Sequence, residues 1–127
     1  FRAWHNELGR MMSIKNMWFQ DSRIEELELN DAVMNEHITA YPDEIELMQS
    51  TGLKDKNGKE IFEGDIVDYK GREAVIKWHG SYASLIYRFV DGLQERVSEW
   101  DPLFLAYYHF EVIGNIYENP ELLEVEE

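Results

Sequence analysis

Four histidines are the residues of this chain whose type is most often found at metal sites. They are His5, His37, His79 and His109. No two of them have the short spacing that places both rings on one side of a strand or helix, and the chain has no cysteine to complete a zinc site. The sequence therefore predicts no metal centre. We interpret His5 and His79 as polar turn residues and His109 as a ring packed among aromatic neighbours.

Paired carboxylates could support acid–base catalysis, because two carboxyl groups with separated pKa values can act as acid and base. Asp65 with Asp68, and Glu99 with Asp101, are such pairs. A chain with 26 acidic residues is expected to contain close pairs by chance. We therefore expect no catalytic residue. A small enzyme with an unrecognised carboxylate site is kept as an alternative.

Sequence motifs for nucleophilic catalysis and phosphate binding are absent. Ser81 and Ser84 lie near a histidine, but neither stands in a Gly-x-Ser-x-Gly motif. Gly52, Gly58 and Gly64 recur every six residues, and each is expected to end a turn rather than to form a phosphate-binding loop. The sequence accordingly predicts no bound cofactor.

The aromatic residues are a stronger signal. The chain holds more of them than a small barrel can bury, so some are expected at the surface, where they could anchor a protein interface. The candidates for this interface are Trp18, Phe19, Tyr82, Trp100, Tyr107 and Tyr108. The alternative interpretation is that the aromatic side chains fill the core and a contact between two lobes.

The formal charge of −14 argues against anionic partners. Residues 1–50 carry 4 basic and 10 acidic side chains, and residues 51–127 carry 8 and 16, so both parts are acidic. Such a field repels phosphate backbones and anionic membranes. The one candidate basic patch consists of Lys54, Lys56, Lys59, Lys70 and Arg72. Because acidic residues are interleaved with it, direct nucleic-acid binding is not expected.

Length and composition indicate an ordinary globular chain. Its 127 residues suffice for one domain, or for a compact barrel with an appended lobe, and a hydrophobic content of 44% can build a core. The absence of cysteine excludes disulfide stabilisation. No apolar run has the length of a membrane span, and the N-terminus lacks a signal-peptide pattern, so we expect a cytoplasmic location.

Strand patterns in the first part of the chain are uneven. Residues 1–4 and 11–19 are predicted to form a hairpin joined by a polar turn. The stretch 20–44 has no sustained periodicity, which predicts short strands and loops and the most variable part of the molecule. Acidic and apolar residues alternate in 43–49, which predicts a half-buried strand.

Turns and strands alternate more regularly after residue 50. Asn57-Gly58 favours a tight turn with a positive φ angle at the glycine. Gly64-Asp65 opens a β-branched strand, and the Asp65 carboxylate can accept hydrogen bonds from nearby turn amides. The strands predicted in this part lie at 65–69, 72–79, 83–89 and 110–113. Turns at 79–81 and 91–92 are expected between them.

Alternation along these strands assigns the core. The residues expected to be buried are Ile66 or Val67, Ile76, Trp78, Leu85, Tyr87, Val112 and Ile116. The run 103–107 is apolar without alternation and fits either a helical turn or a buried strand. Asn119-Pro120 is expected to open a terminal turn whose leucines pack on the core.

Together these patterns predict a mainly β fold with little helix. The bent strand entry, the meander and the glycine-interrupted closing strand favour a small SH3-like barrel at 51–127. Residues 1–50 would form an N-terminal β-rich lobe packed on the barrel, within one structural domain overall.

Two segments of the chain resemble the YopX family of phage and prophage proteins. They are Thr51–Val67, with its Asn57-Gly58 turn, and Phe110–Leu122, with its Gly114-Asn115 bend. The resemblance implies a family without an established biochemical activity. It also implies that the natural start lies upstream of Phe1, because family members carry a few polar residues before a Phe-Arg-Ala-Trp segment.

The leading functional hypothesis is a non-enzymatic accessory protein of a phage or prophage that binds another protein, either a host factor or a second copy of itself. An aromatic anchor flanked by carboxylates suits a basic partner surface. The alternative is an acidic nucleic-acid mimic that blocks a host DNA-binding protein. A membrane is not an expected partner.

Overall fold

The structure is a computed structural model, and it describes residues 1–79, 84–90, 101–102 and 107–123. The chain divides into two compact units, Phe1–Gln49 and Ser50–Glu127. Antiparallel strands dominate both, and the helical elements with assigned bounds are short 3-10 turns. The prediction of a mainly β fold is thus confirmed. The SH3-like barrel is not confirmed, since the described strands belong to separate sheets that do not close.

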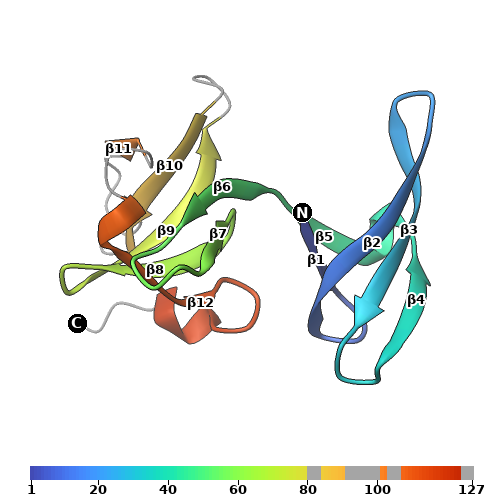
Figure 1. The fold of residues 1–127 in the computed structure, drawn as a ribbon, viewed down its shortest axis with the longest axis horizontal. Coiled ribbons are helices and arrows are strands. Elements are labelled where there is room, and N and C mark those ends of the chain that lie inside the picture. The colour runs from blue at the N-terminus through green and yellow to red at the C-terminus, as the bar shows by residue number, and fades with distance from the viewer. Residues whose placement is uncertain (80–83, 91–100, 103–106, 124–127) are drawn as a thin grey trace. The chain divides into compact units, whose positions relative to one another are not determined.

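The first unit is a single antiparallel sheet with the strand order β4-β3-β2-β1-β5 (Figure 1). Its elements are β1 (Arg2–His5), β2 (Arg10–Gln20), β3 (Arg23–Asp31), β4 (Glu36–Ala40), η1 (Pro42–Glu44) and β5 (Ile45–Met48). β1 and β2 form the predicted hairpin. One face of the sheet carries the core, which contains Ala3, Met12, Leu27, Leu29, Ala40 and Ile45.

The stretch 20–44 is more regular than the sequence predicts. It contains β3, with nine residues, and β4, with five, instead of short strands and loops. The register between β2 and β3 shifts twice, between Ile14 and Asn16 and again between Trp18 and Phe19. A bulge inserts one unpaired residue and so reverses the alternation of faces along a strand. The second shift leaves Glu25 of β3 without a partner, which explains why Ile24 and Leu27, three residues apart, both pack against the core.

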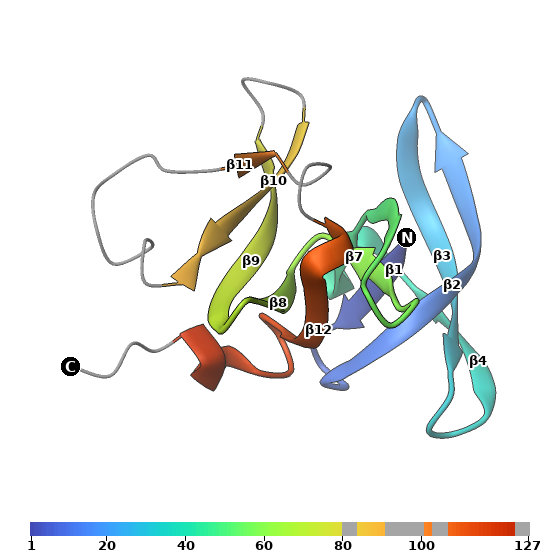
Figure 2. The same cartoon turned by 60° about the vertical axis from the view of Figure 1, so that its left-hand side comes forward.

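The second unit contains two described sheets. Its elements are β6 (Ser50–Lys54), β7 (Glu60–Phe62), β8 (Asp65–Tyr69), β9 (Arg72–His79), β10 (Ser84–Phe89), β11 (Asp101–Pro102), η4 (Tyr107–His109), β12 (Phe110–Asn115) and η5 (Pro120–Leu123). One sheet has the order β11-β10-β9-β8-β12 (Figure 2), and β6 pairs with β7 in the other. The predicted meander β8-β9-β10 is confirmed, as is the bend in β12, where the register shifts between Val112 and Gly114.

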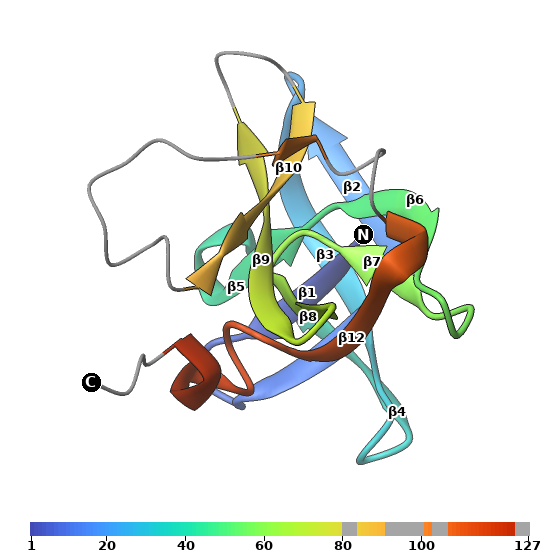
Figure 3. The ribbon, with the colours of Figure 1, turned by 90° about the vertical axis from the view of Figure 1, so that its left-hand side faces the viewer.

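Two groups of buried residues hold the second unit together. The larger contains Ile61, Val67, Ala74, Ile76, Tyr87 and Phe110, with Leu53 of β6 packed against it. The side chains therefore come from both sheets. Figure 3 shows strands of both sheets around β9. On the opposite face of β8 and β9 lie Ile66 and Val75, against which Leu122 and Leu123 of the terminal turn pack as predicted.

One core prediction is wrong. Trp78 shares a strand face with the buried Ile76, yet its side chain is 48% exposed. It lies at the end of β9, opposite Leu85, which is half-buried. Periodicity assigns a residue to a face but does not say how far along the strand the covering layer reaches. Ile66, Val67, Ile76 and Tyr87 are buried as predicted, and Leu85, Val112 and Ile116 are half-buried.

The turn at Asn57-Gly58 provides the first testable prediction. Gly58 has a φ of 82°, and its N–H donates to the Asp55 carbonyl over 3.0 Å. No atom lies close to the place of an added Cβ, so backbone strain alone opposes a side chain there. Gly58→Ala is expected to lower the free energy of unfolding by about 1 kcal/mol or more. Urea denaturation measures this loss, and an unchanged midpoint would contradict it.

The predictions for 80–83, 91–92 and 103–106 fall outside the described residues, so the hairpin at His79-Gly80-Ser81 and the turn at Asp91-Gly92 stay predictions. Of the apolar run 103–107, only Tyr107 is described, and it begins η4.

Candidate protein interface

Two of the exposed aromatic residues of the first unit, Trp18 and Phe19, lie at the tip of the β2–β3 hairpin. Figure 1 shows this hairpin extending beyond β1 and β4. Trp18 is 46% exposed and Phe19 is 59% exposed, next to the end of β2. Large apolar side chains in water cost free energy, and clusters of them mark contact surfaces. We call residues 18–26 the hairpin tip.

Local geometry fixes how the hairpin tip presents its rings. Asp21 and Ser22 have φ angles of 51° and 66°, the left-handed conformation that tight hairpin turns require. Trp18 is paired with Glu26 and Phe19 with Ile24, across a register shift. Consecutive strand residues point to opposite faces, so the tip presents an aromatic ring on each face of the hairpin.

Carboxylates surround these rings. Between Asn16 and Glu28 the chain has the acidic residues Asp21, Glu25, Glu26 and Glu28 against the single basic residue Arg23. An open pocket of about 570 Å³ is lined by Gln20, Asp21, Arg23, Ile24 and Glu25. The hairpin tip thus combines apolar rings with a net negative rim, which favours contact with a basic, partly apolar protein surface.

A second polar group spans β2, β3 and β4. The Glu28 Oε1 lies 3.6 Å from the Lys15 Nζ and 3.3 Å from the His37 Nδ1, and the Asn16 amide donates to Glu28 Oε2 over 3.2 Å. The hydrogen bond from Asn16 contributes most to lowering the pKa of Glu28, and Lys15 and His37 add to it. The Lys15, Glu28 and His37 side chains are partly exposed, and solvent-accessible pairs of this kind contribute little to stability.

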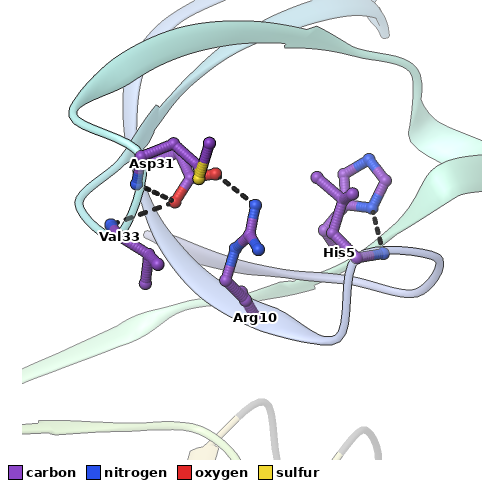
Figure 4. A network of polar contacts seen from close by, with 6 residues as sticks. His5, Arg10, Asp31 and Val33 are labelled. Atoms are coloured by element: carbon purple, nitrogen blue, oxygen red, sulfur yellow. Dashed lines mark hydrogen bonds and ion pairs between the residues drawn. The ribbon is translucent and has the colours of Figure 1, made fainter.

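Figure 4 shows a third polar group. It lies where β2 begins and β3 ends, at the opposite end of these strands from the hairpin tip. The Arg10 guanidinium pairs with the buried Asp31 carboxylate, whose other oxygen accepts hydrogen bonds from the N–H groups of Val33 and Met34. Burial would raise the pKa of Asp31, but the bonds from Arg10 and the turn amides lower it. His5, predicted as a turn residue, is instead the buried last residue of β1, and its Nδ1 accepts a bond from Leu8 N–H of the following turn over 3.1 Å. This group orders two turns.

The other predicted interface residues belong to the second unit or lie outside the described residues. Tyr108 is 54% exposed and Tyr107 is half-buried, and their rings are 5.5 Å apart in η4. Tyr82 and Trp100 are not among the described residues. The described interface candidates therefore form two groups. Trp18 and Phe19 are neighbours in β2, and Tyr107 and Tyr108 are neighbours in η4.

Among the described residues, the carboxylates and histidines considered as candidates for catalysis or metal binding take structural roles. The Asp65 Oδ2 accepts a hydrogen bond from Phe62 N–H over 2.8 Å, which confirms its predicted role at the turn. The His109 ring packs against Tyr108 and Tyr69, as predicted. In the described part of the chain, no three His, Asp or Glu side chains gather at one metal-binding position. No helix there is long and apolar enough to cross a membrane.

Three cations of the predicted basic patch contact neighbouring side chains of the same chain. The Lys56 Nζ lies 3.8 Å from Glu111 Oε2. The Lys70 Nζ is 5.4 Å from the centre of the Tyr69 ring, and the Arg72 guanidinium is 3.6 Å from the centre of the Phe89 ring. These contacts distribute the cations over separate neighbours, in keeping with a surface of mixed charge.

Asp55 is a buried residue whose role the sequence did not reveal. It is 6% exposed, and its carboxylate accepts hydrogen bonds from the N–H groups of Asn57, Lys59 and Val112. The carboxylate thus ties the Asn57-Gly58 turn to β12, which is 57 residues away in sequence from Asp55. The position of Asp55 two residues before the Asn-Gly dipeptide is the signal that could have indicated the local turn bonds.

Comparison with known proteins places the chain in a family. The model of the family described as YopX protein matches residues 1–124. A crystal structure of protein EF1440 from Enterococcus faecalis is similar, with 29% sequence identity and a TM-score of 0.60, over 97% of this chain and 96% of that chain. No curated protein matches. Since the family match extends over nearly all of the sequence, the chain belongs to the YopX family.

Proposed function

We propose that this YopX-family protein is a non-enzymatic accessory protein of a phage or prophage that binds another protein in the bacterial cytoplasm. The observation that carries the proposal is the exposure of Trp18 and Phe19, 46% and 59%, on a projecting and acidic hairpin tip. A preferred partner presents apolar pockets rimmed by lysine or arginine. Tyr107 and Tyr108 are proposed as further contacts from the second unit.

The fold supports a division of roles between the units. The first unit presents the hairpin tip on a single sheet. In the second unit, side chains from two sheets share one core, which supports the proposal of an SH3-like barrel as a scaffold. Aromatic anchors in protein interfaces contribute more binding energy than the polar residues around them. The two rings should therefore dominate affinity, while the carboxylates speed association with a basic partner.

The test compares Trp18→Ala/Phe19→Ala with wild type and with Leu8→Ala as a matched control. Leu8 is also an exposed apolar residue, 41% exposed, but it lies in the turn between β1 and β2. Each protein is immobilised and exposed to a bacterial lysate at low and high salt, and retained proteins are quantified. We expect wild type and Leu8→Ala to retain the same partner at both salt concentrations, and the double variant to lose it by tenfold or more, about 1.4 kcal/mol.

Two outcomes would contradict the proposal. Retention of a DNA-binding protein that high salt abolishes and that the double variant keeps would favour the acidic nucleic-acid mimic. Equal retention of every protein by the double variant and wild type would show that the hairpin tip is not a binding surface.

A further inference from the structure

We propose that a second copy of this chain pairs with the free edge of β4, so that two first-unit sheets join into one continuous antiparallel sheet across a two-fold axis. This surface is distinct from the hairpin tip. In the sheet order β4-β3-β2-β1-β5, β4 has β3 as its neighbour on one side, and no described strand pairs with its other side. An open strand edge carries backbone N–H and C=O groups that can bind another strand.

The β4 edge lacks three of the features that commonly block such pairing. Lysine, proline and bulges keep exposed strand edges from associating. β4 has the sequence Glu36-His37-Ile38-Thr39-Ala40, without lysine or proline, and its pairing with β3 runs without a register shift. The pairing of β2 with β3, in contrast, shifts twice. The regular backbone of β4 is therefore suited to continue the ladder.

One register makes the β4 edge self-complementary. If Ile38 lies on the two-fold axis, Glu36 stands opposite Ala40 of the second copy, and His37 stands opposite Thr39 of the second copy. Like charges directly opposite each other destabilise a sheet, and this register contains none. Within each copy Thr39 of β4 is paired with Glu28 of β3. The second copy's His37, opposite Thr39, would therefore stand in line with the Glu28 carboxylate one strand further on. No like charges therefore face each other directly across the contact.

The same register covers exposed apolar residues at both ends of β4. Val33 and Met34 are 73% and 57% exposed in the turn before β4, and Tyr41 is 50% exposed directly after it. Tyr41 has extended backbone angles, φ −115° and ψ 155°, so the chain stays extended for one residue beyond β4. Antiparallel pairing brings Tyr41 of one copy level with Asn35 of the other, beside the other copy's Val33 and Met34.

Hydrogen bonds hold the residues on either side of β4 in place before any association. The buried Asp31 carboxylate binds the N–H groups of Val33 and Met34 and is itself paired with Arg10 (Figure 4). At the other end, Tyr41 N–H donates to Glu44 Oε1 and Pro42 stops the strand. The exposed apolar residues are therefore held in place before association, which reduces the entropy that binding must overcome.

The net charge of −14 sets the conditions for association. Long-range repulsion between two acidic chains weakens as salt screens it, while hydrogen bonds and apolar contacts at the edge are less affected. The dimer is therefore expected to become more populated with increasing ionic strength. Binding of a basic partner at the hairpin tip would show the opposite trend.

The absence of cysteine allows a test of both the dimer and its register. Ile38→Cys should form an intermolecular disulfide in oxidised glutathione, because directly opposed residues have Cα atoms about 4.5–5.5 Å apart, within disulfide range. Thr39→Cys is the matched control. Its two copies would be offset by two positions, about 7–8 Å apart, which is too far for a ready disulfide. We expect at least tenfold more covalent dimer with Ile38→Cys on non-reducing gels.

Sedimentation of the full chain supplies the second measurement. Wild type, Leu8→Lys and Trp18→Ala/Phe19→Ala should dimerise alike as protein and salt concentrations rise, whereas Met34→Lys should stay monomeric. Met34 and Leu8 are both exposed, so neither substitution threatens the core. Equal cross-linking of the two cysteine variants, or a wild-type monomer at every concentration and salt, would overturn the proposal without affecting the one for the hairpin tip.

Discussion

Phe110→Ala is expected to lower the free energy of unfolding of the second unit by about 3–5 kcal/mol. Phe110 is 0% exposed at the start of β12, and its ring centre lies 5.3 Å from that of Tyr69 and 5.0 Å from that of Tyr87, in edge-to-face geometry. Truncation removes both ring contacts and leaves a cavity that close-packed neighbours fill only partly. Urea unfolding followed by tryptophan fluorescence and circular dichroism measures the loss.

Tyr108→Ala is the matched control, because Tyr108 is an aromatic residue of the adjoining η4 that is 54% exposed. Its substitution is expected to change the free energy of unfolding by about 0.5 kcal/mol or less. Equal effects of the two substitutions would show that Phe110 does not belong to the core. A first-unit transition that stays unchanged in Phe110→Ala would further show that the two units unfold separately.

Periodicity predicted the parts of the fold in which alternation is unbroken. The meander β8-β9-β10 contains Ile76 and Tyr87 at the expected faces, since each strand keeps its period of two. The same argument failed in the β2–β3 hairpin, because the register shift between Trp18 and Phe19 moves Ile24 from the face that simple counting from Leu27 assigns to it. A bulge depends on which strand lies opposite, and the sequence of one strand does not contain that information.

Contacts between residues far apart in the sequence could not be predicted either. Asn57-Gly58 identified its own turn because the required φ angle is a property of the dipeptide. The bond from Val112 to Asp55 joins residues 57 positions apart, so no local pattern reveals it. The same holds for the candidate interface. The aromatic surplus was visible in the sequence, but only the fold shows that Trp18 and Phe19 lie at an exposed tip.

Asp55→Ala is expected to lower the free energy of unfolding by about 3 kcal/mol. The substitution removes the acceptor for the N–H groups of Asn57, Lys59 and Val112, and a buried donor without a partner costs about 1–3 kcal/mol unless water reaches it. Asp55→Asn keeps one side-chain oxygen and should lose less. Urea denaturation at neutral pH compares the variants, and a loss below about 1 kcal/mol for Asp55→Ala would show that the carboxylate is not the link between turn and strand.

The pH dependence of the same variants tests the charge on Asp55. Burial would raise the pKa of its carboxyl group, but the hydrogen bonds from Val112, Lys59 and Asn57 outweigh burial and hold it below the usual 3.8. A group with a lowered pKa in the folded state stabilises the fold fully above its unfolded pKa, and this contribution is lost as pH falls through the folded value. The stability difference between wild type and Asp55→Asn should therefore be constant near neutral pH and shrink below about pH 4. A difference that stays constant throughout acid titration would mean that the hydrogen bonds do not depend on the ionised carboxylate.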